Sequence, residues 1–158
     1  MNRRVAGRYR LLKSLGQGGM GEVFLALDLK TGAECALKRF APRKALDTQD
    51  LRREFEALTR VRHPTVVAAL EFGLDEGGGP FYTMEYVPGR TADAALARGD
   101  WAALCFVGAE VARALEALHP AGVVHGDLKP SNLVVVPGTG PNRRPAAEGI
   151  VSRDWRFL

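Results

Sequence analysis

Three polar side chains in the stretch VVHGDLKPSNLVVV, residues 123–136, have types and spacing suited to phosphate chemistry. Asp127 and Asn132 lie five positions apart, and Lys129 lies between them. Phosphoryl transfer depends on positioning and on neutralising negative charge more than on covalent help, so this set predicts a phosphoryl-transfer centre. Such a centre also needs a metal-binding Asp a short distance downstream, where the sequence reads PGTGPNRRPAAEGIVSRDWRFL.

A glycine cluster near the start of the chain, GQGGMGEV, has the spacing GxGxxG at Gly16, Gly18 and Gly21. Dinucleotide-binding folds use the same spacing, but there the glycines open a helix. Here the apolar positions from Val23 onward alternate as in a strand, which predicts a glycine-rich hairpin whose backbone amides can approach phosphates closely. A plain glycine turn is the alternative.

A lysine and a glutamate between residues 33 and 61 could form an ion pair. Lys38 lies in a predicted strand, 33–40, and Glu54 lies in a predicted helix, 47–61, with Asp47 or Thr48 as its N-cap. Glu54 is three residues after Leu51 and four before Leu58, at the edge of the apolar face formed by Leu51, Phe55 and Leu58. A carboxylate there can hold an ammonium ready for phosphate oxygens, whereas Glu56 points away. A solvated lysine and an exposed glutamate are the alternatives.

The predicted elements form an α+β layout of two lobes. The strand-rich part has strands at 8–16, 22–29, 33–40, 63–74 and 80–87, with turns at 31–32 and 75–79. The helical part has a short helix at 91–99 and a long one within 100–122, with Asp100 as its cap and Gly122 shortly past its end. One side of the long helix is predicted to carry Leu104, Val107, Val111, Ala114, Leu115 and Leu118. A hinge is expected near residues 86–89.

Taken together, the motifs resemble the eukaryotic-like Ser/Thr protein kinase family, of the bacterial type, over residues 8–136. They read GQGGMGEV, CALK, RREFEALTRVRHPTVV, FYTMEYVPG and HGDLKPSN, in family order and spacing. The resemblance implies a kinase-like α+β fold, with a small N-lobe sheet and one helix at 8–87. Residues 88–158 would then be an incomplete, helical C-lobe with an elongated loop at 137–154.

The resemblance implies ATP and Mg²⁺ as cofactors. Glycines of the hairpin would cover the phosphates, and Lys38 would touch the α- and β-phosphates and pair with Glu54. The predicted adenine contacts are the side chains of Val23, Ala36 and Val134, the gatekeeper Met84, and the backbone of Glu85 and Val87.

The resemblance also implies a role for each polar residue of the catalytic loop. Asp127 would accept the proton of a Ser or Thr hydroxyl on a protein substrate, Lys129 would steady the transferred group, and Asn132 would hold a Mg²⁺ ion. The loop departs from the family at Gly126, where many kinases have an Arg that pairs with a phosphate on the activation loop. Without this Arg, the resemblance does not imply control by activation-loop phosphorylation. HGD also resembles small-molecule phosphotransferases of the aminoglycoside and choline kinase type, a minor alternative.

The second metal-binding Asp is not found where the family pattern expects it, at Pro145. Asp154 is a poor candidate, because Ser152 stands where an apolar residue is expected. WRFL has the pattern of the strand that leads into this Asp, so the sequence is interpreted as a truncated kinase fragment with little activity by itself. A pseudokinase or nucleotide-binding interaction module is the alternative.

The composition is that of an ordinary soluble domain, with 46% apolar and 25% charged residues and a net charge of +4. No basic stripe is interleaved with aromatic residues, so nucleic acid is not an expected partner.

Cys35 and Cys105 are interpreted as reduced core thiols. Without an 18-residue apolar run or a signal peptide, the chain is expected in the cytoplasm. A missing segment or a partner is expected to cover the apolar side of helix 101–118.

Overall fold

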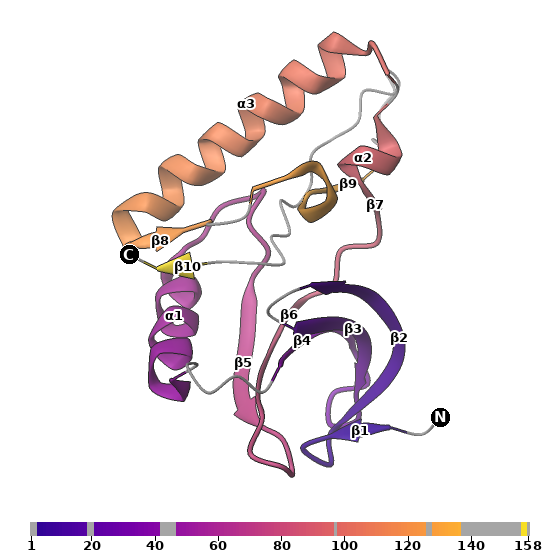
Figure 1. Cartoon of the computed structure of the whole chain (residues 1–158), viewed down its shortest axis with the longest axis vertical. Helices are drawn as coiled ribbons and strands as arrows, with labels where there is room; N and C mark the ends of the chain where they lie inside the picture. The colour runs from indigo at the N-terminus through magenta and orange to yellow at the C-terminus, as the bar shows by residue number, and fades with distance from the viewer. Residues whose placement is uncertain are drawn as a thin grey trace. The chain divides into compact units, whose positions relative to one another are not determined.

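The computed structural model describes residues 3–18, 21–41, 47–96, 98–125, 128–136 and the backbone of 156–157. The chain divides into two compact units. The first consists of residues 1–59 and 68–86, and the second of residues 60–67 and 87–158. Figure 1 shows the strands β1–β6 in the first unit and the helix α3 in the second.

The first unit is built on one six-stranded antiparallel sheet, in the order β1-β2-β3-β4-β6-β5. Its strands are β1 (Arg4–Val5), β2 (Tyr9–Gly18), β3 (Gly21–Asp28), β4 (Glu34–Phe40), β5 (Ala69–Leu74) and β6 (Pro80–Glu85). Each strand predicted from the sequence is present, and the turn at 31–32 is confirmed by Gly32, which has φ +74°. An α+β fold is therefore confirmed.

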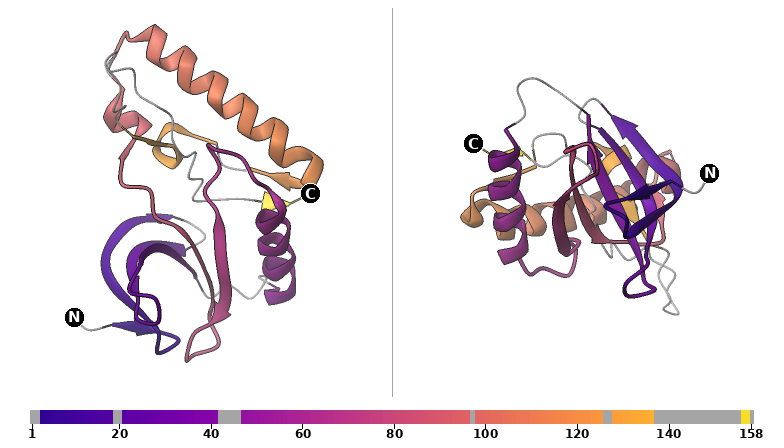
Figure 2. Two further views of the ribbon diagram at one scale, coloured as in Figure 1. Left: turned by 180° about the vertical axis from the view of Figure 1, so that it is seen from behind. Right: turned by 90° about the horizontal axis from the view of Figure 1, so that it is seen from below.

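The sheet curls strongly, so that residues near its two edges meet (Figures 1 and 2). The Arg8 guanidinium, at the start of β2, lies 2.7 Å from the Glu71 carboxylate of β5. The Gly7 amide donates to the Glu76 carboxylate at 2.8 Å. One face of the curled sheet forms an apolar core, which consists of Val5, Tyr9, Leu11, Ala26, Cys35, Leu37 and Phe81, with Phe24 packed against it.

Asp28 is a buried polar junction at the end of β3. Its carboxylate accepts two hydrogen bonds from the Arg8 guanidinium, both at 2.7 Å. It also accepts from the Lys30 amide at 2.9 Å and from the Thr31 hydroxyl at 3.0 Å. The Arg8 hydrogen bonds are the main reason that the pKa of Asp28 lies well below its usual range. The junction holds the β3–β4 turn against β2.

Helix α1 (Thr48–Arg60) begins directly after Asp47, whose carboxylate accepts from the Gln49 amide at 2.7 Å. Asp47 is therefore the N-cap, one of the two residues predicted. The predicted apolar face is confirmed, because the buried residues of the helix are Leu51, Phe55 and Leu58.

The strand predicted at 63–74 begins later, at Ala69. The residues before it form a turn in which the Val66 amide donates to the His63 carbonyl at 3.1 Å. The Thr65 hydroxyl and amide also contact Nδ1 of His63, at 2.8 and 3.3 Å. Local side-chain hydrogen bonds of this kind compete with strand pairing, and the apolar pattern of the sequence did not show them.

The second unit contains the longest helix, α3 (Trp101–Leu118). The Asp100 carboxylate accepts from the Ala103 amide at 2.9 Å, so the predicted N-cap is confirmed. The helix ends earlier than predicted, because Pro120 follows and the chain continues as the 3₁₀ turn η1 (His119–Ala121). Gly122, with φ +75°, ends that turn in the left-handed conformation.

The apolar stripe of α3 was predicted correctly at four positions and incorrectly at others. Its buried residues are Ala103, Val107, Val111, Ala114 and Leu118. Leu104 is 48% exposed, as are Trp101 and Phe106 at 72% and 39%. Most of the predicted apolar side of α3 is therefore buried, and the exposed apolar residues are Leu104 from that side together with Trp101 and Phe106 outside it.

The rest of the second unit consists of short elements. They are β7 (Arg90–Thr91), α2 (Ala92–Ala95), β8 (Val123–Val124), the 3₁₀ turn η2 (Pro130–Asn132), β9 (Val134–Val135) and β10 (Arg156–Phe157). Strand β9 pairs with β7, and β10 pairs with β8. The strand predicted at WRFL is thus present as β10, and its partner is β8 rather than β9. The helix predicted at 91–99 is reduced to α2, because Thr91 pairs with β9 and Leu96 is extended and ends the helix.

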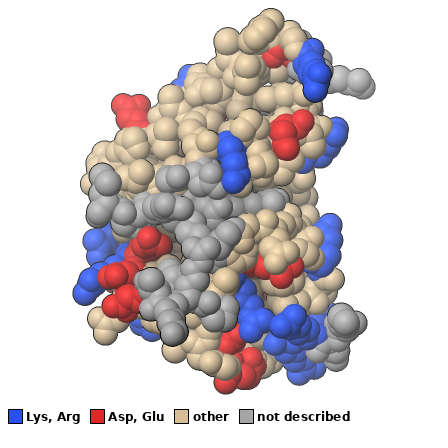
Figure 3. Space-filling view, in the orientation of Figure 1, with Lys and Arg blue, Asp and Glu red and all other residues tan. Residues whose placement is uncertain are grey.

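The two cysteines differ, and the prediction that both are core thiols is wrong for Cys105. Cys35 is buried and Cys105 is exposed, and both are free. Within the described ranges, no helix is both long and apolar enough to cross a membrane. On the face shown in Figure 3, basic and acidic side chains both occur, so no single sign of charge covers that face.

Candidate functional site

The glycine-rich hairpin joins β2 and β3, as predicted. Gly16 lies opposite Val23 and Gly18 lies opposite Gly21, and the glycines open no helix. Gly21 has φ +150°, and a Cβ atom added there would lie 2.0 Å from the Arg39 carbonyl oxygen of β4. Gly21 is therefore required both by its backbone conformation and by the close approach of the neighbouring strand.

The register of the sheet brings four predicted nucleotide contacts to one face. Val23 lies opposite Lys38, and Ala36 lies opposite Met84, in adjacent antiparallel pairs. Directly opposite residues of antiparallel strands share a face, and residues two apart on one strand do too. All four are buried, with exposed fractions between 2% and 5%. They lie on the face opposite the core that contains Leu37.

Lys38 occupies an environment that the sequence did not reveal. It is 2% exposed, and its Nζ lies 5.2 Å from the ring centre of Phe40 and 5.9 Å from that of Tyr82. Burying an ammonium is costly, and aromatic faces offset part of that cost. Phe40, two residues along the same strand, could have been identified from the alternation, but Tyr82 required the strand pairing.

Glu54 lies in α1, on the side of the sheet that carries Lys38. The ring of its neighbour Phe55 packs against Tyr82 and Phe72, with centroid separations of 6.0 and 5.9 Å. Tyr82 is the cross-strand partner of Lys38. Glu54 is half-buried. Helix α1 is thus packed against the strand next to Lys38, and the ion pair between Lys38 and Glu54 stays a prediction.

The predicted adenine-binding backbone falls at the boundary between the two units. Glu85 is the last residue of β6, opposite Cys35, and its amide donates to the Ala68 carbonyl at 2.9 Å. Val87 is the first residue of the second unit after that strand.

In the second unit, the turn η2 positions two of the predicted catalytic-loop residues. The Asn132 amide donates to the Lys129 carbonyl at 2.9 Å. Asn132 is 4% exposed, whereas Lys129 is exposed. Asp127 and Gly126 lie outside the described residues. An amide oxygen is a suitable ligand for Mg²⁺, so the chemistry of Asn132 fits the predicted ion. In the described part of the chain, no group of three His, Cys, Asp or Glu residues could hold a metal.

Strand β9 is anchored directly after η2. Its Val134 and Val135 pair with Thr91 and Arg90. The Ala92 amide donates to the Leu133 carbonyl at 2.9 Å. A Cβ atom added to Gly89 would lie 2.6 Å from the Val134 side chain, so β9 packs tightly against the segment that follows Val87.

These features are those of a protein kinase domain, and comparison with known proteins agrees. The family described as "Protein kinase domain" matches residues 9–143. The chain belongs to this family.

Its relatives include bacterial enzymes and a solved kinase domain. The chain is 36% identical over 140 residues to serine/threonine-protein kinase pkn3 of Myxococcus xanthus, covering 84% of this chain and 25% of that protein. It is 38% identical over 139 residues to the DNA damage-responsive serine/threonine-protein kinase RqkA of Deinococcus radiodurans, covering 83% and 20%. The PknI kinase domain of Mycobacterium tuberculosis superposes with a TM-score of 0.70 at 28% identity, covering 95% of this chain and 61% of that one. The chain thus spans a quarter or less of these two curated relatives.

Proposed function

We propose that this chain contributes to a protein kinase that transfers the γ-phosphate of ATP, bound with Mg²⁺, to Ser or Thr hydroxyls of proteins. The observation that carries the proposal is the buried Lys38, which shares one sheet face with Val23, Ala36 and Met84. A buried ammonium beside small and apolar side chains suits a ligand with a planar apolar part and a phosphate tail. The names of the relatives support the Ser/Thr class.

On this proposal, residues 8–87 are the N-lobe and residues 88–158 are the beginning of the C-lobe. The hairpin glycines Gly16, Gly18 and Gly21 would cover the phosphates, and the Lys38 ammonium, held by Glu54, would contact them. The adenine ring would lie against Val23, Ala36, Met84 and Val134, with backbone contacts at Glu85 and Val87.

Three residues of the catalytic loop would act on the substrate and the ion. Asp127 would accept the proton of the attacking hydroxyl, Lys129 would neutralise the transferred group, and Asn132 would bind the Mg²⁺ ion that balances phosphate charge. The burial of Asn132 supports this role, because a buried amide keeps one orientation.

Calorimetric measurement of Mg²⁺·ATP binding tests the nucleotide half of the proposal. Lys38→Met should weaken binding by at least about tenfold, because it removes a charge-assisted contact to phosphate. Lys13→Met, which removes the same charge from an exposed position on β2, is the matched control and should change binding by less than about twofold. Equal effects of the two changes would contradict the proposed role of Lys38.

Phosphorylation of a generic Ser/Thr protein substrate tests the catalytic half. Asp127→Asn should lower the rate at least about 100-fold, the range of a lost general base. The matched control Asp93→Asn, at an exposed position of α2, should leave the rate unchanged. We expect the 158-residue chain alone to have little activity, because Asn132 is the one predicted Mg²⁺ ligand in its described part. Nucleotide binding without transfer, in this chain and in longer forms alike, would favour the interaction-module alternative.

A further inference from the structure

The first unit has a cavity of about 510 Å³, lined mainly by residues on the side of the sheet opposite Lys38. Its walls come from the base of the glycine-rich hairpin (Gln17, Gly18, Gly21 and Glu22) and from the β5–β6 turn. Phe24 and Arg39 line it from β3 and β4, and Arg3 lines it from the N-terminal segment. Strand alternation places Glu22, Phe24 and Arg39 on the face opposite Val23 and Lys38, whereas Gly21 and Phe40, which also line the cavity, lie on the Lys38 side. The cavity therefore opens mainly away from the predicted nucleotide face and meets it at the end of the hairpin. Its volume lies in the range of small-molecule sites.

One side of this cavity is rigid because Asp75 organises it. The Asp75 side chain is 4% exposed and pairs with the Arg39 guanidinium, accepting from Nε at 2.9 Å and also from Nη2. It accepts from the amides of Gly77 and Gly79 at 3.0 and 2.7 Å as well. Burial acts to raise the pKa of Asp75, but the hydrogen bonds from Arg39 and two glycine amides outweigh it and lower the pKa. Asp75 is thus a fully engaged carboxylate that fixes one guanidinium at the cavity.

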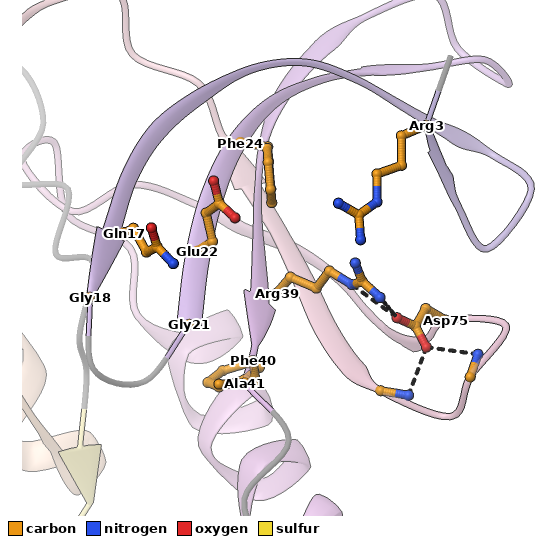
Figure 4. A pocket seen from close by; sticks show the side chains of 12 residues that line it. Arg3, Gln17, Gly18, Gly21, Glu22, Phe24, Arg39, Phe40, Ala41 and Asp75 are labelled. Carbon is orange, nitrogen blue, oxygen red and sulfur yellow. Dashed lines mark hydrogen bonds and ion pairs between the residues drawn. The ribbon is translucent and has the colours of Figure 1, made fainter. Parts of the chain in front are cut away.

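A second guanidinium, that of Arg3, projects into the same space (Figure 4). Asp75 is already engaged by four N–H donors, and among the described residues no carboxylate forms an ion pair with Arg3. Glu22 lies on the other side of Phe24 from Arg3 in this view. Arg39 is paired with Asp75, so Arg3 is the guanidinium that can attract an anion, and the charges of Glu22 and Asp75 disfavour a ligand with more than one negative charge.

We propose that this cavity binds a small organic monoanion with an apolar body, of the class of aryl or branched-chain carboxylates. The carboxylate would lie between the guanidiniums of Arg3 and Arg39. The apolar body would pack on Phe24, whose partly buried ring continues the core of the first unit.

A titration with phenylacetate, in which the amide chemical shifts are monitored by NMR, tests the site. The amides of Gly18, Gly21, Gly77 and Gly79 are expected to shift. Arg3→Ala should weaken binding about tenfold, because it removes a charge-assisted contact. The matched control is Arg4→Ala: Arg4 is the next residue, exposed at the start of β1, and it does not line the cavity, so binding should change by less than about twofold.

Three outcomes would overturn the proposal. Unchanged cavity amides would rule out the site. Equal weakening by Arg3→Ala and Arg4→Ala would mean that phenylacetate responds to net charge alone. Acetate binding as tightly as phenylacetate would refute the apolar part of the site.

A ligand in this cavity would also contact the hairpin whose glycines are proposed to cover the phosphates, which makes the cavity a regulatory site; this step rests on the proposed function. Saturating phenylacetate should change the affinity for Mg²⁺·ATP by at least about threefold in the unmodified chain and not in Arg3→Ala. Phenylacetate binding without any nucleotide binding would refute the proposed function and leave the site standing. Independent binding of both ligands would refute the regulatory step.

Discussion

The two units of the molecule are stabilised by different kinds of side chain. In the first unit, large side chains fill the core, as in the edge-to-face contact of Tyr9 with Phe81, whose ring centroids are 5.7 Å apart. Ion pairs such as Arg8–Asp28 and Arg39–Asp75 tie distant strands together. A sheet that curls on itself can enclose such a core without a second layer.

In the second unit, the buried side chains of α3 are Ala, Val and Leu, and the aromatic residues Trp101 and Phe106 lie on the surface. In the described part of α3, Arg113 forms a local ion pair with Glu110, which joins neighbouring turns of one helix. This difference shows that contacts between distant segments stabilise the first unit. In the second unit, local helix interactions and the packing of small side chains account for much of the structure of α3.

Thiol reactivity should show the largest difference between the units. Burial is the main cause that raises the pKa of Cys35, to about 11, and the nearby Asp28 charge adds to it. Only about 0.1% of that thiol is ionised at pH 8, and reagent access also needs local opening, so Cys105 should react with iodoacetamide more than about a thousandfold faster. Mass spectrometry of timed digests measures both rates. Similar rates would show that the first unit opens freely.

Two leucine truncations compare the core of the first unit with the surface of α3. Leu37→Ala should lower the free energy of unfolding by about 3 kcal/mol, because this fully buried side chain leaves a cavity in the core. Leu104→Ala, the control in the second unit, should cost less than about 0.5 kcal/mol. Urea denaturation measures both. A large effect at Leu104 would show that α3 is covered in solution.

The Asp28 junction should make part of the stability depend on pH. Asp28→Asn should cost about 1–2 kcal/mol at pH 7, because it weakens charge-assisted hydrogen bonds to Arg8. The pKa of Asp28 is lowered in the folded state, so its contribution is present at neutral pH and is lost as pH falls below about 4. The difference between the variant and the unmodified chain should therefore shrink toward acid pH. The exposed Asp93→Asn should show no such difference at any pH.

The smallest effect concerns the N-cap of α3. Asp100→Ala should lower stability by about 1 kcal/mol, because it leaves the Ala103 amide without its acceptor. Asp100→Asn keeps an acceptor and should recover most of this loss. Circular dichroism melts of both variants provide the measurement. No loss in Asp100→Ala would mean that packing alone determines where α3 begins.

Local signals predicted much of the fold and of the candidate site. Capping at Asp47 and Asp100, the spacing of Leu51 and Phe55, and the hairpin glycines depend on residues close in the sequence, and all were predicted. The late start of β5 was missed because the hydrogen bonds between His63 and Thr65 leave no apolar pattern. The pairing of β10 with β8 was missed because short strands choose partners by tertiary context.

The sequence by itself determined the family, the order of the motifs and the types of residue that the chemistry needs, because these depend on residue identity and spacing. Only the tertiary structure decided that Val23, Ala36, Lys38 and Met84 share one face of the sheet, since strand register is a property of pairing. The curl that joins Arg8 to Glu71 was likewise decided there, because these partners lie far apart in the chain and meet only when the sheet closes on its core. The pairing of β4 with β6 similarly brings Arg39 to Asp75 in the β5–β6 turn.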